Sequence, residues 1–234
     1  MGVMAKESAI AILSGGLDSS ISLVLAKKRY EVNLALTFDY GQRAAVKEIG
    51  AAGALCQREK IEHKVLSIPW LAEITKTSLV NRDREVPLIR SYDLDNPVVT
   101  AASAQSVWVP NRNGLFINIA ACYADQHKAA VILTGFNREE AATFPDNSED
   151  FAKAATGSLF FSTQVRARVE SLTQSMSKEE IVREALRLDF PLEILWSCYE
   201  GGERMCGVCE SCLRSKRAFE KGGGAARMKG SFQM

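Results

Sequence analysis

The sequence predicts a doubly wound α/β domain built on a mainly parallel sheet, with a small appendage at its C-terminal end. Short apolar runs alternate with stretches of helical length through the first half of the chain. Such alternation is typical of parallel strands joined by right-handed crossover helices. Four of the six cysteines then gather between positions 198 and 212, which indicates a separately stabilised segment. We therefore expect a main domain over residues 1–193 and a helical C-terminal segment over residues 194–234.

The first half of the chain continues this strand and helix alternation. Residues 8–13 form an apolar run rich in Ile and Ala, and the loop after it leads into a helical pattern. We expect helices on both faces of the resulting sheet. The predicted strands cover residues 8–13, 32–38 and 61–68, and the predicted helices cover residues 18–29 and 43–58.

The second half is less regular. Residues 69–110 combine charge clusters, prolines and weak periodicity, which predicts a long functional or mobile loop, and residues 136–165 are also expected to be irregular. A capping box is predicted at the start of one later helix, where Ser177 caps and Glu180 reaches back. Cys56 and Cys122 lie in apolar helical patterns and are expected to be core thiols. The remaining predicted elements are helices over residues 112–126, 177–188 and 213–221, a buried strand over residues 129–134, and a frayed glycine-rich tail.

Composition and charge limit the partners of the chain. Its 234 residues are 47% hydrophobic, and 29 basic side chains nearly balance 28 acidic ones. Nonspecific nucleic-acid binding requires a broad positive field, so we expect small-molecule substrates and no stable nucleic-acid partner. At the N-terminus, Lys6 and Glu7 precede a short apolar run that ends at Gly15, a pattern of neither a signal peptide nor a membrane span. We expect a cytoplasmic protein without a membrane partner.

A serine- and glycine-rich loop follows the first predicted strand, with the sequence Ser14-Gly15-Gly16-Leu17-Asp18-Ser19-Ser20 directly after Leu13. Glycines let the backbone approach a ligand closely, and the following helix directs free N–H groups and its positive dipole end at an anion. The hydroxyls of Ser14, Ser19 and Ser20 add donors for phosphate oxygens. Asp18 suits a phosphate site when a Mg²⁺ ion lies between them. The alternative is an ordinary turn with Asp18 or Ser19 as the helix N-cap.

The loop lacks the Gly-Lys-Ser or Gly-Lys-Thr ending of the Walker loop and the third glycine of the dinucleotide fingerprint. It resembles the Ser-Gly-Gly-x-Asp-Ser loop of the PP-loop ATP pyrophosphatases. That resemblance implies an adenine nucleotide alpha hydrolase-like fold, ATP as a substrate, and AMP and pyrophosphate as products. It makes residues 13–20 the expected nucleotide-binding segment, with Ser14, Asp18 and Ser19 as the catalytic candidates.

The cysteine cluster consists of Cys198, Cys206, Cys209 and Cys212 in the spacing C-x7-C-x2-C-x2-C. Thiolates two residues apart on a tight turn can reach one ion, and four complete the closed tetrahedral shell of a structural Zn²⁺ site. An iron–sulfur cluster is the alternative, because C-x2-C-x2-C also occurs in ferredoxin-type runs. Leu213 follows the last cysteine where such runs often have proline. We expect zinc, and we expect it to fold the tail rather than catalyse.

Three further segments give a more specific resemblance. Together with the loop and the cysteines, the sequence resembles the 7-cyano-7-deazaguanine synthase family over nearly its whole length. The resemblance implies conversion of 7-carboxy-7-deazaguanine and ammonia to the nitrile through an adenylated intermediate, on the route to queuosine or archaeosine, by a homodimer. The segments are Tyr40-Gly41-Gln42-Arg43, Val109-Pro110-Asn111-Arg112-Asn113 and Trp196-Ser197-Cys198-Tyr199-Glu200-Gly201-Gly202.

The resemblance makes Tyr40, Gln42, Arg43, Arg112 and Asn113 substrate-binding candidates. The guanidinium of Arg112 suits a carboxylate or phosphate, and the amide of Asn113 suits a purine-like edge. The residues after the second strand lie where open α/β folds bind ligands. The alternatives are a solvated helix start at Arg112, capped by Asn111, and an ordinary exposed loop at residues 40–43. Trp196 is expected to pack in the core.

One segment departs from the family pattern. Many members carry Tyr-Pro-Asp-Cys-Arg-Pro-Glu-Phe where this chain has Phe144-Pro145-Asp146-Asn147-Ser148-Glu149-Asp150-Phe151. Asp146 is a candidate for a guanine-like edge because a carboxylate accepts two N–H bonds. The alternative is an Asx-type turn around residues 145–147. Because this arginine is missing, one alternative is a related enzyme that stops at the amide or conjugates the acid. Two further alternatives are a tRNA-modifying PP-loop enzyme and a nucleotide-binding module without turnover.

Overall fold

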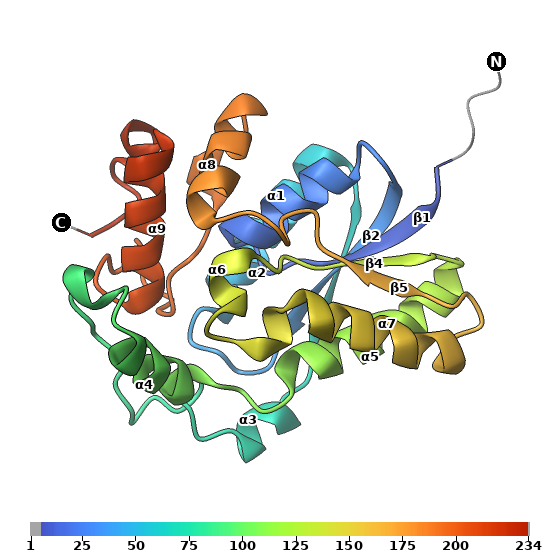
Figure 1. The fold of residues 1–234 in the computed structure, drawn as a ribbon, viewed down its shortest axis with the longest axis horizontal. Helices are drawn as coiled ribbons and strands as arrows, with labels where there is room; N and C mark the ends of the chain where they lie inside the picture. The colour runs from blue at the N-terminus through green and yellow to red at the C-terminus, as the bar shows by residue number, and fades with distance from the viewer. Residues whose placement is uncertain (1–5, 234) are drawn as a thin grey trace.

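A five-stranded parallel sheet forms the centre of the computed structural model, which describes residues 6–233 (Figure 1). Met1 to Ala5, the start of the segment that was expected not to be a signal peptide, lie outside this range. The strand order is β3-β2-β1-β4-β5. Because β1 lies between β2 and β4, the chain reverses its direction of progress at the carboxyl end of β1, where ligands bind in such folds. The strands are β1 (Ser8–Ile12), β2 (Glu31–Asp39), β3 (Glu62–Ser67), β4 (Val131–Leu133) and β5 (Arg168–Glu170).

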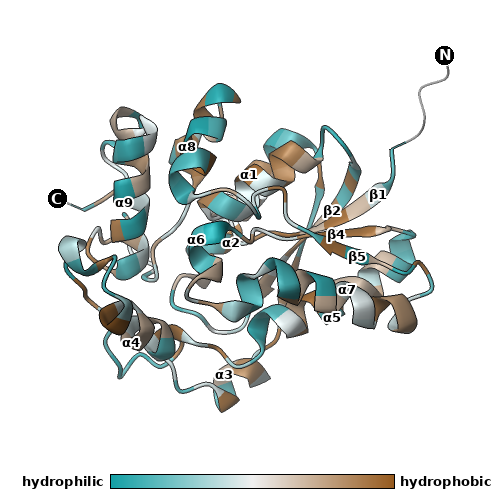
Figure 2. Ribbon diagram, in the orientation of Figure 1, coloured by the Kyte–Doolittle hydropathy of each residue, from teal (hydrophilic) through white to brown (hydrophobic). Residues whose placement is uncertain are grey.

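Helices cover both faces of the sheet, which confirms the predicted doubly wound architecture. Successive residues of β1 point to opposite faces, as the strand period of two requires. Ala9 and Ala11 belong to one core cluster with residues of α1 (Leu17–Ala26), α2 (Ala45–Glu59) and α8 (Lys178–Arg187). Ile10 belongs to the other, with residues of α5 (Arg112–His127) and α7 (Glu149–Ser162). Apolar residues concentrate on the central strands of the sheet (Figure 2).

The C-terminal segment packs on the main domain, with α9 (Glu210–Gly222) beside α8 (Figure 1). Phe219 and Met228 are buried in the same cluster as β1. The prediction of a frayed tail is wrong. The tail forms the short helix η4 (Ala225–Met228), and its last residues are hydrogen-bonded to the backbone of Met205. The N–H of Met205 donates to the carbonyl of Ser231 at 3.0 Å. The boundary between residues 193 and 194 stays a prediction, since both sides share one core.

Two stretches predicted as loops contain helices, so those predictions are wrong. Residues 69–110 hold α3 (Trp70–Ile74), η1 (Ser91–Asp93) and α4 (Pro97–Val107), and residues 136–165 hold α6 (Arg138–Ala141), η2 (Pro145–Asn147) and α7. Their start signals are present in the sequence: Asn96 caps α4, and the hydroxyl of Ser148 accepts the N–H of Phe151 at 3.1 Å. Their apolar periodicity is weak because α7 fully buries only Ala152 and Leu159. No strand was predicted at β5 because two of its three residues are charged, whereas β4, of the same length, is entirely apolar.

The predictions for the two isolated cysteines have different outcomes. Cys56 is buried in the core, as predicted. Cys122 is exposed, so its prediction as a core thiol is wrong. Helix α5 turns Ala120, Ala121 and Ala124 toward the sheet instead. The capping box of Ser177 and Glu180 is confirmed at the start of α8. Within residues 6–233, every helix is too short or too polar to cross a membrane.

Candidate functional site

The serine- and glycine-rich loop joins β1 to α1 at the carboxyl edge of the sheet. Gly16 is the N-cap of α1 and no side chain caps the helix, so Asp18 and Ser19 are not ordinary N-caps. The hydroxyls of Ser14 and Ser19 lie 3.0 Å apart, and the N–H of Gly16 reaches the Ser14 hydroxyl at 3.3 Å. Backbone donors and hydroxyls therefore gather at the positive end of α1, the arrangement that binds phosphate.

Gly15 is required for this loop to lie against α2. Its φ is +75°, and a Cβ there would lie 2.7 Å from the carbonyl oxygen of Glu48 and 2.9 Å from the nitrogen of Ala52. We expect Gly15→Ala to lower the free energy of unfolding by about 1–3 kcal/mol and to raise the KM for ATP, because the loop must shift. Urea unfolding and ATP titration measure both effects.

Gly50→Ala is the matched control for Gly15→Ala, since it adds the same methyl group in α2 where nothing lies within 4 Å. It should raise stability by about 0.5–1 kcal/mol and leave the KM for ATP unchanged. Equal effects of the two substitutions on the KM for ATP would contradict the role assigned to the loop conformation.

A cavity of about 250 Å³ opens in front of the loop. Leu13, Ser14, Gly16, Leu17, Asp18 and Ser19 of the predicted nucleotide segment line it, whereas Gly15 and Ser20 do not. Ser20 is 1% exposed and points its hydroxyl into the protein. The other walls come from segments far apart in the sequence: Thr37, Tyr40 and Glu48 near β2, Arg112 and Asn113 of α5, Glu140 and Asn147 after β4, Lys178 of α8, and Trp196, Cys198, Tyr199, Ser211 and Ser215 of the C-terminal segment.

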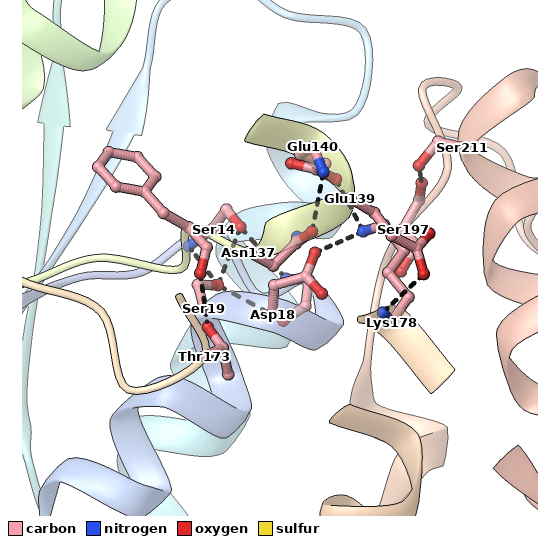
Figure 3. A network of polar contacts seen from close by, with 12 residues as sticks. Ser14, Asp18, Ser19, Asn137, Glu139, Glu140, Thr173, Lys178, Ser197 and Ser211 are labelled. Atoms are coloured by element: carbon pink, nitrogen blue, oxygen red, sulfur yellow. Dashed lines mark hydrogen bonds and ion pairs between the residues drawn. The ribbon is translucent and has the colours of Figure 1, made fainter. Parts of the chain in front are cut away.

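A buried lysine that no sequence motif had indicated lies in this cavity. The Lys178 Nζ atom is 2.6 Å from Oδ2 of Asp18 and 2.7 Å from Oε1 of Glu140. Figure 3 shows these three side chains converging from α8, α1 and α6. In the sequence, Lys178 is only the second residue of a capping box. For Glu140 the sequence contains one weak signal. The acidic pair Glu139-Glu140 follows β4, and β4 ends at the edge of the sheet where ligands bind.

The charges of Asp18, Lys178 and Glu140 favour binding of a metal cation, either alone or together with a phosphate. Burial raises the pKa of Asp18 to about 6, although Lys178 opposes the shift. Burial would lower the pKa of Lys178, but the carboxylates of Asp18 and Glu140 outweigh it and raise that pKa above its usual value. Among residues 6–233 no partner satisfies Oδ1 of Asp18, which is buried. A carboxylate oxygen without a donor beside a phosphate-type loop is suited to Mg²⁺.

The other end of the cavity carries a second charged group. An Nη atom of Arg112 donates to the hydroxyl of Tyr40 at 3.3 Å, and Tyr40 is 5% exposed. Burial raises the pKa of the Glu48 carboxyl, which accepts an amide N–H of Gln42 at 2.9 Å. Arg112 is thus held inside the site and is not the solvated helix start of the alternative interpretation. Asn111 is the N-cap of α5 by position only, since its side chain makes no capping bond.

Three substrate-binding candidates lie behind the cavity wall. Gln42 is 5% exposed and bonds the backbone of residues 38–40. Arg43 binds the carboxylate of Glu200 at 2.8 Å and the carbonyl of Asn81 at 3.0 Å, which ties two loops together. The carbonyl of Asp146 accepts the side-chain N–H of Asn113 at 3.2 Å, while its neighbour Asn147 reaches the cavity. Trp196, expected in the core, is partly buried and also lines the cavity.

The four cysteines of the C-terminal segment come together at the first turn of α9. Their sulfurs all lie within 4.8 Å of one another, and two pairs are separated by 3.9 and 4.0 Å. A tetrahedral Zn²⁺ ion with Zn–S bonds of about 2.3 Å gives sulfur separations of about 3.8 Å. Backbone N–H groups of Glu200 and Cys206 each point at the Cys198 sulfur at 3.3 Å, as donors to a thiolate do. The cluster therefore fits a zinc site.

The cysteine cluster and the cavity are in contact. Cys198 belongs to the cluster and also lines the cavity. Helix α9, which has Cys209 as its N-cap, presents Ser211 and Ser215 to the cavity from its first two turns. The hydroxyl of Ser211 donates to the carbonyl of Ser197. A metal bound by the four sulfurs would consequently hold one wall of the cavity in place.

Comparison with known proteins agrees with this geometry. A family described as "Queuosine biosynthesis protein QueC" matches residues 8–223. The 7-cyano-7-deazaguanine synthase of Pelotomaculum thermopropionicum is 50% identical over 214 residues, covering 92% of this chain and 97% of the relative. That of Methanosarcina barkeri is 48% identical over 218 residues, covering 92% and 94%.

One solved structure supports the fold. The U34-tRNA thiolase NcsA from Methanococcus maripaludis, solved with its [4Fe-4S] cluster, has a TM-score of 0.50 and 14% identity, covering 98% of this chain and 75% of its own. Identity at this level relates the two proteins by fold alone. The extended match to the family and to its curated relatives is the stronger finding. The chain belongs to the QueC family of queuosine biosynthesis proteins.

Proposed function

We propose that this protein converts 7-carboxy-7-deazaguanine and ammonia to 7-cyano-7-deazaguanine, with ATP consumed and AMP and pyrophosphate released. The observation that carries the proposal is one cavity in which a phosphate-type loop, an unpartnered Asp18 oxygen and the Lys178 ammonium face Arg112. The 50% identity to a 7-cyano-7-deazaguanine synthase supports the choice of substrate. Such a reaction would supply a queuosine or archaeosine precursor.

Residues 13–19 hold the nucleotide in this proposal. The hydroxyls of Ser14 and Ser19 and the N–H groups at the start of α1 bind the β- and γ-phosphates. Asp18 would contact Mg²⁺, which when bound neutralises phosphate charge and orients the leaving pyrophosphate. Lys178 compensates the charge that develops on the transferred phosphorus group, because it is the cation nearest to Asp18.

Two activations convert the acid into the nitrile. A carboxylate oxygen of the substrate attacks the α-phosphorus, the bond to the β-phosphate oxygen breaks, and pyrophosphate leaves. Ammonia then attacks the acyl carbon and AMP leaves, which gives the amide. The amide oxygen attacks the α-phosphorus of a second ATP, pyrophosphate leaves, and one N–H proton is lost to give the adenylated imidate. Loss of AMP with its electron pair and of the second N–H proton then forms the nitrile. Catalysis here consists mainly of positioning and charge neutralisation.

The base and its carboxylate need separate contacts. We assign the carboxylate to Arg112, whose guanidinium is planar and bidentate, and the ring edge to Tyr40 and Asn113. Asp146 acts from behind the wall, where its carbonyl holds the side chain of Asn113. Gln42 and Arg43 support the loops behind these residues. Arg112 belongs to a segment shared with the family, so the carboxylate keeps this partner although position 148 is a serine.

The cysteine cluster holds zinc in this proposal. Sulfur separations of 3.9 and 4.0 Å suit one tetrahedral ion with a closed shell, so the metal supports structure. Metal analysis of the purified protein is expected to find zinc without iron or acid-labile sulfide. Iron with sulfide would overturn the assignment in favour of a cluster.

From the family resemblance we also propose a cytoplasmic homodimer. Helix α4 contains no charged side chain, and its Val98 is 77% exposed, which suits a protein contact. Sedimentation equilibrium distinguishes the dimer from the monomer.

The test of the function is incubation with ATP, Mg²⁺, ammonium and 7-carboxy-7-deazaguanine, followed by mass spectrometry. We expect the nitrile together with AMP. Accumulation of the amide alone would replace the proposal by a related amide-forming enzyme, and AMP formation that does not depend on the acid would reject both.

The protonation of Asp18 predicts a pH dependence. Its carboxylate must be ionised to bind Mg²⁺, and its pKa is raised to about 6, so the competent fraction falls as the pH drops through that value. We expect kcat/KM for ATP to decline by about tenfold per pH unit below the apparent pKa of the free enzyme. Circular dichroism at each pH checks that the protein stays folded. A constant kcat/KM from neutral pH to well below the pKa would contradict the role of Asp18.

A further inference from the structure

The amino group of Lys178 lies between two carboxylates of the cavity wall, so two acidic side chains converge on one cation. Its Nζ atom is 2.6 Å from Asp18 and 2.7 Å from Glu140, and its side chain is only 9% exposed. Two carboxylates facing one ammonium group leave one negative charge without a partner when all three are ionised. Mg²⁺ at the free oxygen of Asp18 would arrive with the larger negative charge of the nucleotide phosphates, so a further small cation is still electrostatically favoured beside this group.

Glu140 can take such a cation although it is paired with Lys178, because its side chain also lines the cavity. Asp18 is part of the nucleotide loop, and the Glu48 carboxyl at the other end of the cavity is bonded by Gln42. The Glu140 side chain keeps 33% of its surface exposed and lines the cavity. Its backbone is fixed, because its N–H donates to the Asn137 side chain at 2.9 Å within the short helix α6.

We propose that Glu140 binds the ammonium ion that supplies the nitrogen and accepts its proton. This inference rests on the proposed function and assigns the ammonium-binding residue of that reaction. One N–H proton of ammonium passes to the Glu140 carboxylate, and the freed lone pair forms the C–N bond with the acyl carbon. The C–O bond to AMP breaks and AMP leaves with its electron pair. The surplus proton on the new nitrogen goes to the AMP phosphate, which leaves the neutral amide.

Binding of ATP is expected to draw Lys178 away from Glu140 and toward the phosphates. The phosphates bring negative charge to the loop beside Asp18, and Lys178 is the adjacent cation. Attraction of Lys178 toward the phosphates would weaken its ion pair with Glu140. The carboxylate is then freer to accept ammonium once ATP is bound, which suits a nucleophile needed only after adenylation.

The experiment compares Glu140→Gln with Glu139→Gln in the full-length protein. Glu139 is the matched control: it is the neighbouring carboxylate, its Oε1 accepts the backbone N–H of Lys178 at 3.0 Å, and it lines a different cavity. Adenylation is measured without nitrogen, as exchange of labelled pyrophosphate into ATP that depends on the acid. Nitrogen transfer is measured twice, with ammonium and with hydroxylamine, which is largely neutral near neutral pH and traps the adenylate as a hydroxamate.

We expect Glu140→Gln to keep exchange and hydroxamate formation near wild-type rates. Ammonium-dependent amide formation should fall by about 100-fold, with a raised KM for ammonium, because general-base contributions are of that size. Glu139→Gln should keep all three activities. Equal losses with ammonium and hydroxylamine, no loss in Glu140→Gln, or the same selective loss in Glu139→Gln would each overturn the ammonium site. Absence of acid-dependent exchange in the wild-type protein would instead overturn the proposed function, and the site with it.

Discussion

Replacing Lys178 by Met is expected to reduce acid-dependent AMP formation by roughly 100- to 1000-fold, the usual loss when a positioned charge is removed from a reacting group. The substitution removes the cation that lies between Asp18 and Glu140 in a nearly closed part of the cavity. It leaves two carboxylates facing each other, which should also lower the free energy of unfolding by about 3 kcal/mol. Protonation of Asp18, whose pKa is already raised to about 6, limits that cost.

The loss of rate and the loss of stability are measured separately. Pyrophosphate exchange is followed at a temperature where urea unfolding shows the variant to be fully native. Lys153→Met is the matched control, because Lys153 pairs with Glu149 at 2.7 Å on the surface of α7 and its side chain is 66% exposed. The exchange rate and the free energy of unfolding of Lys153→Met should both stay near the wild-type values. If folded Lys178→Met protein exchanged pyrophosphate at the wild-type rate, Lys178 would have no role in the reaction.

Loss of the proposed zinc ion has the second large expected effect. We expect Cys212→Ser, or chelation of the bound metal, to lower the free energy of unfolding by more than about 4 kcal/mol and to abolish activity, since structural zinc supplies folding energy directly. Cys212 is fully buried, and the helix that it anchors brings Ser211 and Ser215 to the cavity. The tail and one wall of the site are therefore lost together.

Cys122→Ser controls for the loss of a thiol. Cys122 is exposed and lies on the outer side of α5, so its replacement should change stability by no more than about 0.5 kcal/mol and keep the full metal content. Metal content, thermal unfolding and AMP formation are compared in the three proteins. If Cys212→Ser lost its metal and yet remained as stable and active as wild type, the cluster would not be a support for the site.

The corrections to the predicted elements have a common cause. Helices α4 and α7 are capped by Asn96 and Ser148, but their burial is shallow, so their apolar residues do not repeat with a clear helical period. Cys122 shows the reverse: an apolar neighbourhood in sequence did not reveal which side of α5 would face the sheet. Periodicity reports burial, and it is weakest where a helix covers little of the core.

The sequence by itself determined the local parts of this protein. The Ser14–Ser19 loop and the cysteine spacing are each made within a short segment, because glycine conformation, N–H direction and thiol spacing are local properties. Only the tertiary structure decided what meets across the cavity. Lys178 comes to Asp18 over 160 positions of sequence, and Arg43 binds Glu200 behind the cavity wall. Such pairings depend on how the crossover helices pack on the sheet, and sequence spacing carries no record of that packing.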